Sequence, residues 1–194
     1  EASTIFEIEH GFSDRLNLAL LAEVEDEPGD GPRIEAVAVE GVAYLGHIRP
    51  LKLDVGVYGE YEQRLHGGGG KLETKLLLAR QFGQVQGLFN LIVEKDHVSG
   101  PASEPLELGY AVEATAPVAR GTRLGVQAFG ELGTTKAFGG RQEHFLGPVA
   151  KWKMKSKAIG GAIEFEAAYL VALGSARDDT DGQVRFALEF EKRF

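Results

Sequence analysis

Residues 182–194 read GQVRFALEFEKRF, and apolar and polar side chains alternate along most of this stretch. One set of alternate positions holds Val184, Phe186, Leu188 and Phe190, while the other holds Gln, Arg, Ala and two Glu residues. Successive side chains of a β-strand point to opposite faces of its sheet. The stretch therefore predicts a strand with one apolar face and one charged face.

The same period of two recurs along the whole chain of 194 residues, which contains 26 glycines. Residues 51–62, LKLDVGVYGEYE, follow it most clearly. The segment around Val37 follows it least, because its two faces are nearly equally apolar. We expect eleven strands, in residues 4–12, 15–25, 34–45, 51–62, 71–82, 84–95, 105–118, 122–133, 144–155, 161–173 and 182–194.

The connections between these segments alternate between two kinds. Short turns are expected at residues 12–15, 47–50, 82–85, 118–122 and 156–161. Longer loops, rich in Gly, Pro and acidic residues, are expected at residues 26–33, 64–71, 96–105, 134–143 and 174–182. An antiparallel meander with short turns at one end and long loops at the other is typical of outer-membrane barrels.

In this pattern the chain resembles bacterial outer-membrane β-barrel proteins, and its end, RFALEFEKRF, resembles the aromatic-ended last strand of that class. The resemblance implies a single domain over residues 1–194, an all-β transmembrane antiparallel up-and-down barrel in the outer membrane of a Gram-negative bacterium. It also implies contact with outer-membrane lipid, recognition by the barrel-assembly machinery, and possible association with other membrane-complex subunits. Phe186, Phe190 and Phe194 would form the assembly signal, although Lys192 stands where an apolar residue is usual.

Strand parity adds an expectation about the complete barrel. Single-chain bacterial barrels have an even number of strands with both termini on the periplasmic side. With the last strand ending there, the first of eleven strands runs in the same direction. We therefore expect twelve strands in all, with the twelfth preceding Glu1 or supplied by another chain.

The width of such a barrel assigns its two faces. A barrel of about eight strands is just filled by its own side chains, so eleven or twelve strands leave room inside. We expect the apolar face to contact lipid, the aromatic residues Phe12, Tyr61, Phe82, Trp152, Tyr169 and Phe194 to lie at the interfaces, and the charged face to line a lumen. The expected lumen-lining acids are Glu7, Glu9, Glu23, Glu25, Glu40, Asp54, Glu60, Glu62, Glu73, Glu94, Glu107, Glu113, Glu131, Glu164, Glu166, Glu189 and Glu191, and the bases are Lys52, Lys71, Lys75, Arg123, Lys151, Lys153, Lys155 and Arg185.

The excess of acids in this set leaves two interpretations open. One is a porin-like passive channel that favours cations, because carboxylates lining a narrow pore attract counter-ions. The other is a structural or partner-binding barrel whose lumen is closed by cross-strand ion pairs. A lipid-modifying enzyme is a third hypothesis, for which His97 and Ser99 are the only candidates. His97 and Ser99 lie in an expected loop, and the sequence offers no third residue that would orient the histidine as a catalytic base.

Other classes of function find no support in the sequence. The net charge of −8 argues against nucleic-acid binding, and no run approaches the roughly eighteen apolar residues of a spanning helix. The absence of cysteine removes thiolate chemistry. The acidic stretch RDDTDG, residues 177–182, lacks the remaining features of a calcium loop, and the five histidines have no ligand spacing, so we expect no metal and no cofactor.

Overall fold

The computed structural model describes residues 2–27, 31–67, 69–98, 105–140, 142–156 and 161–192. Eleven β-strands and two short 3-10 helices lie in these residues. They are β1 (Ala2–Ser13), β2 (Leu16–Glu27), β3 (Gly31–Ile48), η1 (Arg49–Leu51), β4 (Leu53–Arg64), β5 (Gly70–Phe82), β6 (Val85–Lys95), β7 (Glu107–Ala119), β8 (Thr122–Thr134), β9 (Glu143–Ser156), β10 (Gly161–Gly174), η2 (Ser175–Asp178) and β11 (Gly182–Lys192).

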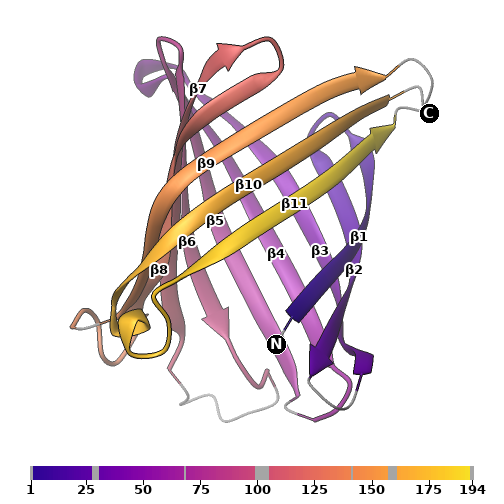
Figure 1. Ribbon diagram of the computed structural model, residues 1–194, viewed down its shortest axis with the longest axis vertical. Coiled ribbons are helices and arrows are strands. Elements are labelled where there is room, and N and C mark those ends of the chain that lie inside the picture. Colours follow the sequence, from indigo (N-terminus) through magenta and orange to yellow (C-terminus); the bar gives the residue numbers. More distant parts are fainter. Residues whose placement is uncertain are drawn as a thin grey trace. The chain divides into compact units, whose positions relative to one another are not determined.

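Consecutive strands are neighbours from β1 through β11, as Figure 1 shows for the series β9, β10 and β11. The pairs β1–β2, β2–β3, β3–β4, β8–β9, β9–β10 and β10–β11 are antiparallel. The described residues therefore form an all-β, antiparallel up-and-down sheet of eleven strands. The number and order of strands expected from the sequence are confirmed.

The chain divides into two compact units. Unit 1 comprises Glu1–Leu78, Leu91–Leu108 and Thr134–Ala137, and unit 2 comprises Ala79–Asn90, Gly109–Gly133 and Phe138–Phe194. Strands β1 to β4 belong entirely to unit 1, and β9 to β11 belong entirely to unit 2.

In unit 1 the strand register separates an apolar face from a polar one. Leu20 of β2 lies opposite Val39 of β3, which in turn lies opposite Tyr61 of β4. One position further along β3, Glu40 lies opposite Glu60. Because side chains alternate along each strand, the apolar residues gather on one side of these strands and the carboxylates on the other.

Unit 2 repeats the separation. Trp152 of β9 lies opposite Phe165 of β10, and Phe165 lies opposite Leu188 of β11. The neighbouring positions Lys151 and Glu166 also face each other across β9 and β10. The period of two in the sequence is thus converted by the register into continuous apolar and polar faces.

One expected loop is largely strand. Residues 26–33 were expected to form a long connection, but β2 continues to Glu27 and β3 begins at Gly31. Glu27 pairs with Gly31 at the end of the ladder. Acidic residues and proline are tolerated at these strand ends because the backbone hydrogen bonds of the ladder hold the strands in place.

The beginning of β4 also differs from the expectation. Pro50 lies in the first turn of η1, and Lys52 follows this helix in the left-handed conformation, with φ 50°. Proline has a φ suited to such a turn and lacks the N–H that a central ladder position needs. Strand β4 therefore starts at Leu53, and Lys52 lies in a turn, outside the strands that were expected to contain it.

The best-buried apolar residues are few and mostly small. They are Ala19, Ala36, Val149, Ala162, Ala168, Leu170, Ala172 and Ala176. Many large apolar side chains are exposed instead, including Leu20 at 66%, Phe186 at 71% and Leu188 at 75%. Large aliphatic and aromatic residues are the ones that normally fill a water-excluded core, so this distribution is unusual.

Candidate functional site

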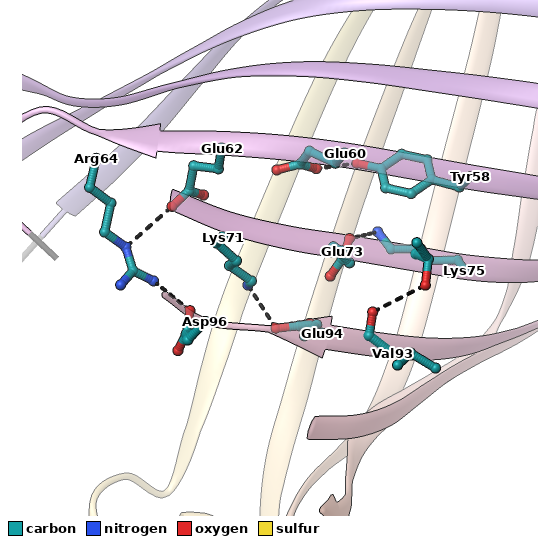
Figure 2. Close-up of polar contacts among 11 residues, drawn as sticks. Tyr58, Glu60, Glu62, Arg64, Lys71, Glu73, Lys75, Val93, Glu94 and Asp96 are labelled. Atoms are coloured by element: carbon teal, nitrogen blue, oxygen red, sulfur yellow. Dashed lines mark hydrogen bonds and ion pairs between the residues drawn. The ribbon is translucent and has the colours of Figure 1, made fainter. Parts of the chain in front are cut away.

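The candidate site is the polar face, and in unit 1 it carries a ladder of ion pairs (Figure 2). Arg64, the last residue of β4, joins two elements, because its Nε lies 3.3 Å from Glu62 Oε1 and its Nη2 lies 3.0 Å from Asp96 Oδ1. Residue 64 was expected in a loop. The ladder pairing of β4 instead extends to this position, and the guanidinium binds both carboxylates from there.

Two lysines of β5 continue the ladder (Figure 2). Lys71 Nζ lies 2.8 Å from Glu94 Oε2 of β6, and Lys75 Nζ lies 2.6 Å from Glu73 Oε1 of its own strand. Residues two apart on a strand share a face, which explains the second pair. The side chains of Lys75 and Glu73 are only 23% and 13% exposed.

Tyr58 connects this ladder to a pair of carboxylates. Its hydroxyl lies 2.7 Å from Glu40 Oε2 and also within hydrogen-bond distance of Glu60 Oε2, while Lys75 Nζ lies 4.1 Å from the centre of the Tyr58 ring. A phenol carries one proton, so it donates to one carboxylate at a time. In the described part of the chain, neither glutamate takes part in an ion pair with Lys or Arg, so the two share a single neutral donor.

In unit 2 the corresponding ladder centres on β9. Lys151 Nζ lies 2.7 Å from Glu113 Oε2 of β7 and 3.0 Å from Glu166 Oε2 of β10. Lys153 pairs with Glu164. Each lysine reaches an acid on a neighbouring strand because the register places opposite charges on the same face.

Arg123 of β8 and the buried Thr115 of β7 form a hydrogen-bonded pair beside this ladder. Arg123 Nε donates to Thr115 Oγ1 at 3.1 Å, and Arg123 Nη2 donates to the Thr115 carbonyl oxygen at 2.8 Å. Thr115 is 1% exposed. The two bonds satisfy the buried hydroxyl and fix the position of the guanidinium.

The polar face of unit 2 also includes an apolar cluster that the sequence analysis missed. Val149, Ala168 and Leu170 are buried together, and Phe129 and Phe145 pack against them with their rings stacked, 5.2 Å between centroids. The signal was present in AAYLVAL, residues 167–173, where the alternation fails and both faces are apolar. Such a segment predicts apolar side chains on both faces of its strand, and the structure buries one of these faces while Tyr169 and Val171 on the other stay exposed.

The structure places most of the expected lumen-lining residues on the polar faces. In unit 1 these are Glu7, Glu9, Glu23, Glu25, Glu40, Asp54, Glu60, Glu62, Lys71, Glu73, Lys75 and Glu94, and in unit 2 they are Glu113, Arg123, Lys151, Lys153, Glu164, Glu166, Arg185 and Glu189. Glu107 begins β7, and Glu131 lies in β8.

Some of these acids have neutral partners. Asn17 Nδ2 donates to Glu9, and Ser3 Oγ donates to Glu23 Oε1 at 2.6 Å. Near η1, Asp54 Oδ1 accepts from the Tyr44 hydroxyl at 3.0 Å and lies 2.9 Å from His47 Nδ1. These carboxylates lie toward the β1 edge or the strand ends, away from the lysine ladders.

The structure describes only some of the residues predicted for the assembly signal and for catalysis. Phe186 lies on the apolar face, while Phe194 and the side chains of Phe190 and Glu191 lie outside the described residues. His97 follows β6 with φ 51°, and Ser99 lies outside the described residues, so the pairing of these two residues stays a prediction. In the described part of the chain, no three His, Asp or Glu residues gather in a way that could hold a metal ion.

Comparison of the chain with protein-family models, curated proteins and solved structures found no match. Among the described residues, neither of the short helices has the length and apolar character needed to cross a membrane.

Proposed function

We propose that this chain forms the wall of a transmembrane β-barrel in a bacterial outer membrane, with its apolar face against lipid and its polar face around a water-containing lumen that passes small cations. One observation carries the proposal: the apolar face is more exposed than the charged face. In β7, which has a neighbouring strand on each side, Val112 is 39% exposed, whereas the side chain of the adjacent Glu113 is 13% exposed. In a protein surrounded by water the reverse is expected.

Hydrocarbon as the surrounding solvent explains this inversion. Leu and Phe side chains that face lipid carry no free-energy penalty, while a charged side chain on the lipid-facing surface of a barrel costs about 2 to 4 kcal/mol at the bilayer midplane. A closed antiparallel barrel is one of the two backbone arrangements that a bilayer tolerates, and the eleven-stranded meander would supply most of the wall of such a barrel. Lipid and the barrel-assembly machinery are then partners of the chain, and other membrane-complex subunits are further candidates.

The single tryptophan provides a direct test of which face meets lipid. Trp152 lies on the apolar face beside Phe165, with ring centroids 5.5 Å apart, and Phe165 stacks in turn with Phe186 at 6.1 Å. For the chain folded in vesicles, we expect lipids with brominated acyl chains to quench Trp152 fluorescence and aqueous acrylamide to have little effect.

A relocated tryptophan is the matched control. In a Trp152→Phe background, Tyr58→Trp moves the fluorophore to the polar face of β4. There we expect quenching by acrylamide and little by brominated chains. Quenching of Trp152 by acrylamide alone, with brominated chains ineffective, would refute insertion with the apolar face outward.

A cation pathway is favoured by the carboxylates that have no base beside them. Glu40 and Glu60 share one phenol, and acids outnumber bases among the described residues of the polar faces. Carboxylates that line a narrow aqueous path lower the energy of a cation there and raise that of an anion.

A closed, structural barrel is the second candidate, and the ladders favour it. Lys151 is bound by two acids, and the cluster around Leu170 leaves that residue with no exposed surface. Reconstitution in a planar bilayer separates the candidates, because a passive channel gives steady ionic current from folded protein. A properly inserted chain that passes no current leaves the structural barrel as the function.

A further inference from the structure

We propose that the free edge of β1 binds one further β-strand, which runs antiparallel to β1 and carries Lys or Arg at alternate positions. Strand β1 begins the strand order and pairs with β2 along eleven positions. Among the described strands none pairs with its other edge, and backbone N–H and C=O groups cost several kcal/mol each in a membrane when unsatisfied. A strand is the element that satisfies such a row of groups.

The direction of the partner follows from the alternation of the sheet. Neighbouring strands in an up-and-down sheet run in opposite directions, so the odd-numbered β1 and β11 run the same way. A second copy inserted in the same orientation could place its β11 beside β1 only as a parallel pair. It could place its own β1 there as an antiparallel pair only if that copy were inverted in the membrane. The occupant is therefore a strand outside β1–β11, running opposite to β1.

The charge of the partner follows from the polar face at this edge. Strands β1 and β2 carry Glu7, Glu9, Glu23 and Glu25 on that face and contain no Lys or Arg. Opposite charges on directly facing positions stabilise a strand pair, and like charges destabilise it. An acidic partner strand would place like charges opposite Glu7 and Glu9, whereas a basic one places opposite charges there.

Strand β9 illustrates the kind of strand that fits. It alternates Lys151 and Lys153 with Trp152 and Met154, and its lysines bind one acid of β7 and two acids of β10. A strand of this pattern beside β1 would direct its bases toward Glu7 and Glu9 and its apolar side chains to the same side as Phe6 and Ile8. The inference goes beyond the proposed membrane function, because it concerns an edge and its partner rather than a face and its solvent.

The probe is a synthetic peptide with the sequence of residues 149–156, VAKWKMKS, its seventh residue replaced by Cys. In an antiparallel pair this Cys faces Ile5 when the two remaining lysines face Glu7 and Glu9. The chain has no cysteine of its own, so single cysteines report position. With the full chain folded in detergent micelles, we expect Ile5→Cys at the β1 edge to form a disulfide with the peptide at least fivefold faster than Val42→Cys does. Val42 lies in β3, which is paired on both sides.

Charge variants complete the test. A peptide with its two lysines replaced by glutamate should give no edge-selective disulfide. In the protein, Glu7→Lys with Glu9→Lys should lower peptide affinity on the order of tenfold, since two attractive pairs become repulsive. Glu7→Gln with Glu9→Gln should give an intermediate loss and serves if the lysine variant fails to fold.

Equal disulfide rates at Ile5→Cys and Val42→Cys, or equal reaction of the basic and acidic peptides, would overturn the inference. Neither result bears on the quenching of Trp152 by brominated lipid. Failure of the partner strand is therefore distinguishable from failure of membrane insertion.

Discussion

At the scale of single residues, Gly147 shows how closely the strands of unit 2 approach each other. A Cβ on Gly147 would overlap the Tyr169 carbonyl oxygen of β10 and lie 3.0 Å from Leu170 Cα. Both obstacles are backbone, so relief requires the strands to separate. We expect Gly147→Ala to lower the free energy of unfolding by about 1 to 3 kcal/mol, measured by urea titration of the folded protein in detergent.

Gly59 of β4 provides the control for this substitution. A Cβ there meets nothing within 4 Å. Alanine restricts the unfolded chain more than glycine does, so Gly59→Ala should leave stability unchanged or raise it by up to about 1 kcal/mol. Equal losses for the two variants would mean that any side chain is tolerated poorly in these strands, and the close approach at Gly147 would not be the cause.

Tyr58 is the second residue with a specific expected effect. Tyr58→Phe removes the one donor that Glu40 and Glu60 share among the described residues, so whichever of these partly buried carboxylates accepts the proton loses that hydrogen bond. We expect a loss of about 1 to 3 kcal/mol in the free energy of unfolding. Adding Glu60→Gln should recover part of it, because the amide NH₂ can donate to Glu40. Tyr61→Phe is the matched control, since the Tyr61 hydroxyl binds Gln63 at an exposed position.

At the scale of elements, the sequence predicted the strands well and their ends less well. Strict alternation locates strands such as β4 and β11, because one face of each differs from the other. It cannot locate the end of β2, where pairing of Glu27 with Gly31 overrides a loop-like composition. Nor can it identify partners: Arg64 contacts Asp96 through a register that no local pattern encodes.

Strand β9 shows what these cross-strand partners contribute. Lys151→Met leaves Glu113 and Glu166 facing each other without a cation between them. Because the three side chains are partly exposed, we expect a loss of about 1 to 3 kcal/mol rather than the full cost of an isolated buried charge. Urea titration measures it, and the triple variant with Glu113→Gln and Glu166→Gln should recover most of the loss.

Lys155→Met on the same strand is the control for Lys151. In the described part of the chain no ion pair involves Lys155, so its substitution should change stability by less than about 0.5 kcal/mol. If Lys151→Met is equally mild, the ladder in unit 2 does not brace the sheet, and the argument for a closed structural barrel loses its main support.

At the scale of the whole molecule, the two-faced pattern was readable from sequence because solvent acts on every strand in the same way. The distribution of charge along the polar face was not readable. The sequence gives an excess of acids, whereas the structure pairs Lys71, Lys75 and Lys151 with particular glutamates and leaves Glu40 and Glu60 with a shared phenol. Any selectivity for cations then depends mainly on the acids without a base.

That dependence gives the prediction for transport. In planar bilayers we expect the unmodified chain to favour potassium over chloride, and Glu40→Gln with Glu60→Gln to bring the permeability ratio toward unity. The control removes the same charge outside the strands, with Asp14→Asn in the β1–β2 turn and Asp179→Asn after η2. Raising the salt from about 0.1 M to 1 M shortens the Debye length from about 10 Å to 3 Å, so selectivity should weaken. If the control reduced selectivity as much as the glutamate pair, the net charge of the protein, and not these two carboxylates, would set the preference.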